Sequence, residues 1–167
     1  IFENAARRTV DLLGGKPIPS GATPVIFDPS VACEFLSLIS GAVCAEPVQK
    51  GKSPLAGKLG EKVASDHVTI SDDGTLEKGI ATSPLDDEGV PTQKTAVIRK
   101  GTLRQYLYDT YGALKDRTVS TGSAGRSGFK SSPSSGPSNF YLEPGQLPRE
   151  RLLSQTRGLY LYDVMGL

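Results

Sequence analysis

Few residues of this chain are histidine or cysteine, the types that most often hold zinc, activate a nucleophile or act as one. There is one histidine, His67, and there are two cysteines, Cys33 and Cys44. A Ser-His-Asp triad could use only His67, and no G-x-S-x-G sequence accompanies it. The cysteines are too far apart for a zinc knuckle, and no second Cys or His pair completes four ligands. The residue types therefore predict a structural or surface role for His67 and no classical hydrolytic triad.

A second group with possible chemistry is the acidic stretch "DDEGVPTQ", in which Asp86, Asp87 and Glu88 precede Gly89. Carboxylates grouped in this way could bind a hard cation such as Ca²⁺. The stretch lacks the alternating ligand spacing of a calcium loop, which favours a solvated turn. Both interpretations stay open from the residues alone.

The elements that must position these groups begin with a helical region. "FENAARRTVDLL" has apolar residues at helical spacing, and "PVIF", residues 24–27, is typical of a short buried strand. Asp28 is a plausible N-cap and Pro29 suits a first helical turn, which predicts a helix from Asp28 to Ala45. Cys33 and Cys44 both fall on that helix. We expect them to be a buried pair of reduced thiols, as in a cytoplasmic protein.

The rest of the chain has a β-rich pattern. Residues 94–109 predict a β-hairpin around Lys100 and Gly101, and "FYLEPG" and "GLYLYDV" predict short strands on either side of a helix in "LPRERLLSQTR". Residues 118–139, the Ser/Gly segment, are rich in Ser, Gly and Pro, so 119–137 should be the most mobile interior segment when no peptide or partner is bound. The fold class is predicted to be α+β, with a mainly antiparallel sheet after an N-terminal helix-strand-helix part.

Size and charge limit the function classes. The chain has 167 residues and a net charge of +1, with no electrostatic footprint for direct contact with nucleic acid. The densest basic group, "RKGTLR" from Arg99 to Arg104, is interpreted as a hairpin turn. No apolar run reaches the roughly 18 residues that span a bilayer, so no membrane role is expected. We expect a single domain over 1–167, with a helix-strand-helix part to residue 50 and a β-rich part over 51–167.

Four long motifs together resemble a known family. They are "LGEKVASDHVTISDDGTL", "DDEGVPTQKTAVIRKGTLRQYLYDTYGALK", "STGSAGR" and "PSNFYLEPG". These stretches closely resemble the C-terminal domain of the TldD/PmbA family, also called modulators of DNA gyrase or microcin-processing peptidases. The resemblance runs in order along the whole chain, which starts at Ile1 without Met and ends on apolar residues. The chain is therefore expected to be a truncated C-terminal domain.

The resemblance implies a cytoplasmic zinc metallopeptidase complex of two related subunits, which cleaves unfolded or leader peptides. The catalytic subunit carries H-E-x-x-x-H on a helix that follows a buried strand. Aligning "PVIFDPSVACEFLSLISGAV" with that region places Ser37, Leu38 and Ala42 at the His, Glu and His positions. This spacing should make the helix end or bulge between the two ligand positions, and Gly41 suits such a distortion.

Loss of these three groups would remove the chemistry. Zinc hydrolysis needs imidazoles to hold the ion and a carboxylate to take a proton from bound water, and Ser37, Leu38 and Ala42 supply neither. The resemblance thus implies a non-catalytic, PmbA (TldE)-type subunit without its own cofactor. Zinc would lie in a TldD-like catalytic partner, although a homodimer is the other possible assembly. The alternatives are an active metallopeptidase with a non-standard site and a protein-binding modulator of DNA gyrase.

Residues of the matched motifs are the candidates for a peptide-binding surface. Glycine lets a backbone approach a bound peptide, Ser and Asn can hydrogen-bond its amides, and Arg126 could hold a carboxylate. The candidate residues are Asp86, Asp87, Glu88, Gly89, Thr121, Gly122, Arg126, Ser138 and Asn139.

Overall fold

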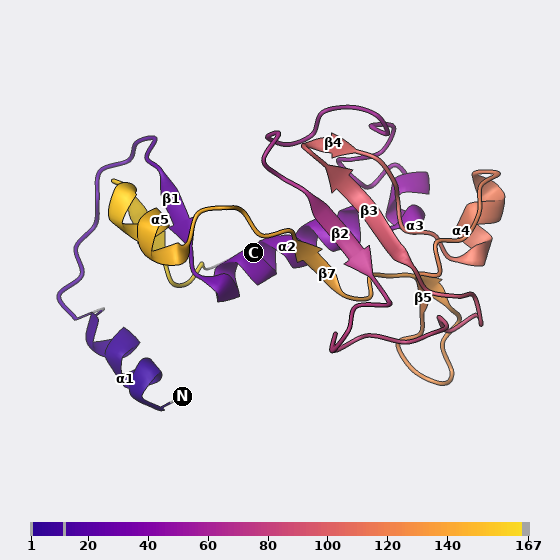
Figure 1. The fold of residues 1–167 in the computed structure, drawn as a ribbon, viewed down its shortest axis with the longest axis horizontal. Helices are drawn as coiled ribbons and strands as arrows, with labels where there is room; N and C mark the ends of the chain where they lie inside the picture. Colours follow the sequence, from indigo (N-terminus) through magenta and orange to yellow (C-terminus); the bar gives the residue numbers. More distant parts are fainter. Residues whose placement is uncertain (1, 12, 165–167) are drawn as a thin grey trace.

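The computed structural model describes residues 2–11 and 13–164, which form five helices and eight strands (Figure 1). In chain order these are α1 (Phe2–Asp11), β1 (Val25–Phe27), α2 (Pro29–Ala42), α3 (Ala45–Gln49), β2 (Ile70–Asp73), β3 (Lys94–Arg99), β4 (Thr102–Leu103), α4 (Thr110–Lys115), β5 (Ala124–Gly125), β6 (Ser134–Ser135), β7 (Phe140–Leu142), α5 (Arg149–Gln155) and β8 (Leu159–Leu161). The α+β class is confirmed. Leu12, within the predicted first helix, lies outside the described residues.

The main sheet is antiparallel and has the strand order β4-β3-β2-β7. The predicted turn is present: Lys100 and Gly101 both have positive φ, and β3 pairs with β4 from Ile98 to Leu103. The second arm is much shorter than predicted, because β4 ends at Leu103 rather than near residue 109. Leu107 instead makes a parallel bridge with Cys44, with its N–H donating to the Val43 carbonyl at 2.9 Å.

Helix α2 begins where the sequence predicts and ends earlier. The Asp28 carboxylate accepts the Ser30 N–H at 3.2 Å, and Pro29 occupies the first turn. The helix ends at Ala42, and a separate helix, α3, starts at Ala45. The prediction of one helix as far as Ala45 is wrong because the backbone leaves the helical path to pair with Leu107: the Ala45 N–H donates to the Leu107 carbonyl at 2.9 Å.

The core lies between α2 and the main sheet. Its buried members come from the residue after α2, the start of α3, the sheet, the segment after β4 and α4: Val43, Ala45, Ile70, Val97, Ile98, Leu103, Tyr106, Leu107, Tyr108 and Ala113. Figure 1 shows α2 running behind the strands, and Leu36 and Ile39 of this helix pack against the buried cluster. Cys44 is buried, but Cys33 is exposed. The expected buried pair of thiols is therefore wrong, because Cys33 lies on the face of α2 turned away from the core.

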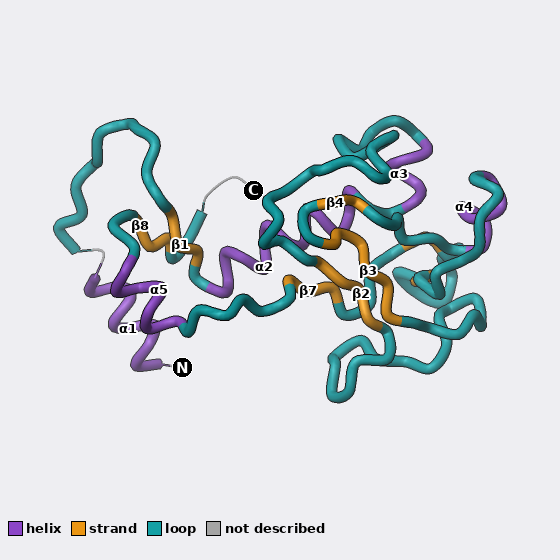
Figure 2. The backbone as a smooth tube through the Cα atoms, turned by 45° about the horizontal axis from the view of Figure 1, so that its top comes forward, coloured by secondary structure: helices purple, strands orange, loops and turns teal. Residues whose placement is uncertain are grey.

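A smaller unit joins the two ends of the chain. Strands β1 and β8 pair in parallel, Val25 with Leu159 and Phe27 with Leu161, and α5 lies beside them (Figure 2). The Tyr160 hydroxyl donates to the Asp28 carboxylate at 3.1 Å, which ties β8 to the start of α2. Among the described residues, no helix has the length and apolar character needed to cross a bilayer.

Candidate functional site

The helix that would carry metal ligands in a catalytic relative is regular here. Ser37 and Leu38 are exposed, Leu38 by 54%, and Ala42 is half-buried. The Val43 N–H donates to the Ile39 carbonyl at 3.1 Å, so the helical bonding continues past Gly41. The bulge expected between Ser37 and Ala42 is absent, because α2 keeps its helical form up to Ala42 and then ends. Residues five apart therefore point in different directions on this helix.

Cys44, just after the end of α2, is in a protonation state that does not favour zinc binding. Burial, together with the neighbouring carboxylates of Asp72 and Asp109, raises the pKa of the Cys44 thiol to about 11. The neutral thiol donates to the Ser40 carbonyl at 3.2 Å. Zinc prefers a thiolate. Together with the side chains of Ser37, Leu38 and Ala42, this means that α2 and Cys44 do not fit a zinc ion.

His67 is exposed, in a turn before β2, as the surface interpretation predicted. Within residues 2–11 and 13–164, no group of three or more His, Cys, Asp and Glu side chains is placed so that it could hold a metal ion. His67, Cys33 and Cys44 are therefore not brought together in the described part of the chain.

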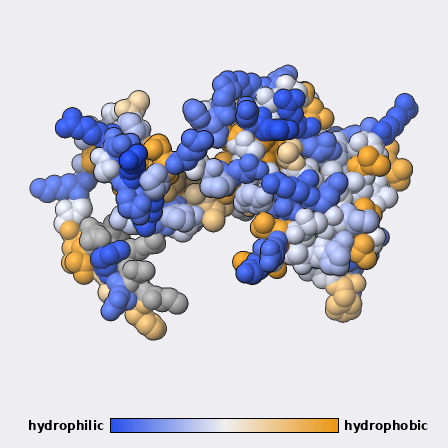
Figure 3. All heavy atoms as spheres, in the orientation of Figure 1, coloured by the Kyte–Doolittle hydropathy of each residue, from blue (hydrophilic) through white to orange (hydrophobic). Residues whose placement is uncertain are grey.

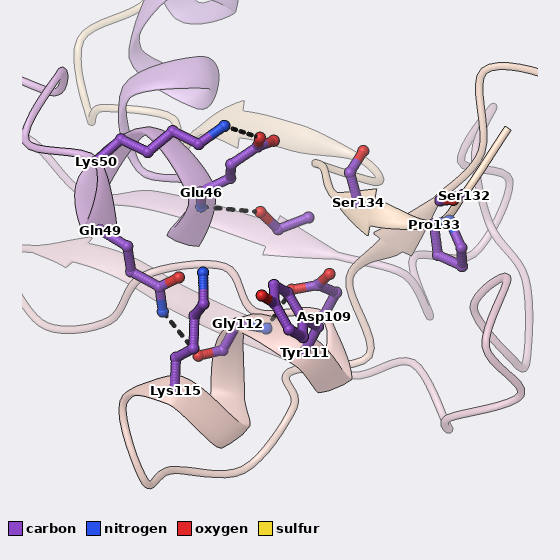
Figure 4. Close-up of a pocket in the computed structure, with 11 residues that line it drawn as sticks. Glu46, Gln49, Lys50, Asp109, Tyr111, Gly112, Lys115, Ser132, Pro133 and Ser134 are labelled. Carbon is purple, nitrogen blue, oxygen red and sulfur yellow. Dashed lines mark hydrogen bonds and ion pairs between the residues drawn. The ribbon is translucent and has the colours of Figure 1, made fainter.

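A groove opens just beyond the end of α2. It has a volume of about 520 Å³ and lies between α3, α4 and the segment around β6 (Figure 4). The lining residues are Glu46, Gln49, Lys50, Asp109, Tyr111, Gly112, Lys115, Ser132, Pro133, Ser134 and Ser135. None of them was among the residues chosen from the sequence. Four of them, Asp109, Tyr111, Gly112 and Lys115, fall in the matched stretch "LYDTYGALK", but the sequence predicted neither a helix nor a groove wall there.

One contact joins the two helices of the groove, and two further contacts lie within single helices. The Gln49 amide donates to the Gly112 carbonyl at 2.8 Å, which joins α3 to α4. Lys50 pairs with Glu46, which lowers the pKa of the Glu46 carboxyl, and the Lys115 ammonium lies 4.5 Å from the centre of the Tyr111 ring. The groove is therefore lined by ammonium, carboxylate and hydroxyl groups, a mixture that can bind polar backbone as well as charged termini.

The acidic turn, residues 86–89, helps to hold in place the two sides of this groove that β6 and α4 form. The Asp86 carboxylate accepts the Ala124 N–H at 3.0 Å, and the Asp87 carboxylate accepts the Arg126 N–H at 2.7 Å. Strand β5 then pairs with β6, Ala124 with Ser135, so the turn fixes the wall that β6 forms. On the other side, the Glu88 carboxylate accepts the Thr110 N–H at 2.7 Å at the start of α4.

The acidic turn is therefore neither simply solvated nor arranged as a calcium loop. Its carboxylates accept backbone N–H groups, and Asp86 accepts two more from Glu88 and Val90, each at 2.9 Å. Gly89 takes the positive φ of this turn. These residues hold the segments that form the groove in place, but they do not line it.

The other candidate residues also lie outside the groove. Thr121 is buried and its hydroxyl accepts the Tyr108 N–H at 2.8 Å, while Gly122 adopts a φ of +66°. The Arg126 guanidinium donates to the Ser131 carbonyl at 2.7 Å, within its own loop, rather than to a carboxylate. The Ser/Gly segment is thus buried and hydrogen-bonded around Thr121. The mobility of residues 119–137 stays a prediction.

Ser138 and Asn139 anchor the far end of the same segment to β2. Ser138 donates its N–H at 2.8 Å and its hydroxyl at 3.1 Å to Asp72, which partly offsets the rise in the pKa of this carboxyl caused by burial. The Asn139 amide donates to the Asp73 carbonyl at 2.8 Å and accepts the Ala81 N–H at 2.9 Å. Direct peptide binding by the residues chosen from the sequence stays a prediction, since each has a bonding role within the fold.

Comparison with known proteins agrees with this architecture. Residues 20–167 match the family model described as the PmbA/TldA metallopeptidase C-terminal domain. The chain belongs to the PmbA/TldD metallopeptidase C-terminal domain family. Among curated relatives, Metalloprotease PmbA of Escherichia coli O157:H7 is 32% identical over 98% of this chain and 34% of its own length. Metalloprotease MJ0996 of Methanocaldococcus jannaschii is 36% identical over 97% of this chain and 36% of its own length.

Solved structures give the same result for the fold. TldE from Thermococcus kodakarensis superimposes with a TM-score of 0.79 and 30% identity over 97% of this chain and 39% of that one. A protein from Thermotoga maritima MSB8, described as a candidate modulator of a DNA gyrase, gives 0.87 and 36% over 97% of this chain and 37% of that one. The PmbA/TldD chain described here spans 34–39% of the length of these four proteins.

Proposed function

We propose that this chain is part of a non-catalytic subunit of a PmbA/TldD-type metallopeptidase complex acting in proteolysis and peptide maturation. The observation that carries the proposal is α2, a regular helix that presents Ser37, Leu38 and Ala42 at the positions where the family resemblance places the His, Glu and His. Neutral Cys44 supports it further. Water activation by zinc needs donor atoms that these side chains lack.

We propose that the groove beyond α2 is the peptide-binding surface of this subunit. It lies next to the helix end at which a catalytic relative would hold its metal, and its walls carry hydroxyl, ammonium and carboxylate groups. Such groups can bind the backbone of an unfolded or leader peptide without demanding a particular sequence. Zinc and the general base would come from a TldD-like partner, or the chain would act in a homodimer. A cytoplasmic location is part of the same proposal.

The test is metal analysis and peptidase assay of the purified chain, alone and after co-purification of the full-length protein with a TldD-like partner that has the H-E-x-x-x-H residues. We expect no stoichiometric zinc and no cleavage by the chain alone, and zinc-dependent cleavage by the pair. One tightly held zinc per chain, lost together with cleavage in His67→Ala, would overturn the proposal and favour a non-standard active site.

A modulator of DNA gyrase is a second candidate, which the description of the Thermotoga maritima neighbour supports. The net charge of +1 favours a protein contact over direct DNA binding. Co-precipitation with purified gyrase subunits, in the absence of DNA, would distinguish this function from a role in proteolysis.

A further inference from the structure

Strand β3 has an edge that its hairpin partner does not cover. It runs from Lys94 to Arg99, while β4 has two residues and pairs with Ile98 and Arg99 alone. The Gly74 N–H donates to the Gln93 carbonyl at 3.3 Å on the β2 side. Because peptide groups alternate along a strand, those of Lys94 and Ala96 face away from β2. In the part of the chain that the structure describes, no other backbone or side chain bonds them.

This edge is accessible through a hollow. The hollow has a volume of about 380 Å³ and is lined by Gln93, Lys94, Thr95, Ala96, Arg104, Gln105, Val119, Ser120 and Thr121. One wall is the segment after β4, where the Arg104 N–H donates to the Val97 carbonyl at 2.8 Å and ends the open stretch. The other wall is the segment Val119–Thr121. Ala96 is exposed between them.

The surface around this edge is basic. Two further hollows, of about 660 and 400 Å³, meet the first at Ala96, and Figure 3 shows hydrophilic side chains over this face of the sheet. The three linings contain Lys94, Arg99, Lys100 and Arg104, and one carboxylate, Glu143. Glu143 is already paired with Lys94 at 3.3 Å. Among the described residues, no carboxylate lies within 4.0 Å of the charged groups of Arg99, Lys100 and Arg104.

We propose that this basic edge, Lys94–Ala96 with Arg99, Lys100 and Arg104, binds an extended peptide segment that carries carboxylates. The segment would add to the sheet as a strand beside β3, with its main chain bonded to Lys94 and Ala96 and its acidic side chains next to the cations. The open edge favours a peptide over nucleic acid, because strand addition needs amide N–H and carbonyl groups. This surface lies apart from the groove at α3 and α4, and it assigns the basic stretch "RKGTLR" a role beyond that of a turn.

The experiment measures fluorescence anisotropy of short labelled peptides with the intact chain. The probe alternates Val and Glu, and the matched control alternates Val and Lys. We expect saturable binding of the acidic probe that weakens as salt is raised, and at least about tenfold weaker binding of the lysine control. An acidic probe N-methylated at alternate amides keeps its charge but loses donors needed for strand addition, so it should bind at least about tenfold more weakly too.

Charge variants locate the site. The double variant Arg99→Glu, Arg104→Glu should lose binding of the acidic probe. The pair Lys16→Glu, Lys52→Glu makes the same change in net charge at exposed positions elsewhere and should retain it. Equal binding of the N-methylated and parent probes, equal loss in both double variants, or tighter binding of a single-stranded DNA oligonucleotide than of the acidic probe would each overturn the proposal. None of these outcomes depends on zinc or on a catalytic partner.

Discussion

The two cysteines differ in their environment, and the difference can be measured. Cys44 is buried with a thiol pKa raised to about 11, so at pH 8 it is almost entirely protonated. Cys33 is exposed on α2. Because the thiolate is the reactive form, we expect one thiol per native chain to react promptly with a colorimetric disulfide reagent at pH 8, and two in denaturant.

The variant Cys33→Ser identifies which thiol reacts. It should abolish the prompt native reaction and leave one thiol in denaturant, whereas Cys44→Ser should leave the native reaction unchanged. Prompt modification of Cys44 in folded Cys33→Ser would contradict the buried, neutral state assigned to it.

At the same scale, Asp86 is the carboxylate with the most bonds to the backbone in the acidic turn. It accepts N–H groups from Glu88, Val90 and Ala124. Asp86→Ala should lower the free energy of unfolding by about 2 kcal/mol, because these donors lose a charged acceptor. Urea unfolding gives the measurement. As a control, Asp66→Ala removes an exposed ion pair with Lys62 and should lower the free energy of unfolding by less than about 0.5 kcal/mol. Equal losses in the two variants would mean that the hydrogen bonds of Asp86 do not stabilise the fold.

At the scale of elements, local signals predicted those structures whose causes are local. The Asp28 cap and Pro29 place the start of α2, and Lys100-Gly101 places the hairpin turn. The end of α2 was misplaced because its cause is a bridge between Cys44 and Leu107, far apart in sequence. The β5–β6 pair could not be predicted for a related reason. Ser and Gly have low strand propensity, and β5 is held in place by a hydrogen bond to the acidic turn, which comes from another part of the chain.

The loop before β5 depends on one glycine conformation. Gly122 has a φ of +66°, and a Cβ added to it would lie 2.3 Å from the Pro91 carbonyl oxygen. Gly122→Ala should therefore lower the free energy of unfolding by at least about 2 kcal/mol, from backbone strain and the clash. Gly125→Ala is the matched control, since Gly125 has an ordinary φ and nothing within 4 Å of an added Cβ. Urea unfolding of the two variants compares them, and a loss in Gly125→Ala as large as in Gly122→Ala would contradict this account.

At the scale of the whole molecule, pairing between distant segments decides the architecture. Strands β1 and β8 come from opposite ends of the chain, so no local pattern could predict that they pair in parallel. The groove is likewise assembled from three separate segments, α3, α4 and β6, and the residues that hold it are not the ones that line it. The motif residues could be found from the sequence because they are typical of the family. Their bracing role could not, because it depends on which N–H groups the fold brings to each carboxylate.

The distribution of buried residues predicts that the two parts of the molecule differ in stability. Among the residues whose burial the structure describes, no member of the main hydrophobic cluster comes from α1, β1, α5 or β8, and the three residues of β8 are only half-buried. A two-stranded sheet with little buried apolar surface opens at low free-energy cost. Hydrogen exchange should therefore deuterate the peptide amides of β1 and β8 well before those of β2 and β3, at a denaturant concentration at which the main sheet stays protected. Simultaneous exchange in both sheets would mean that the tie from Tyr160 to Asp28 and the start of α2 joins them into one cooperative unit.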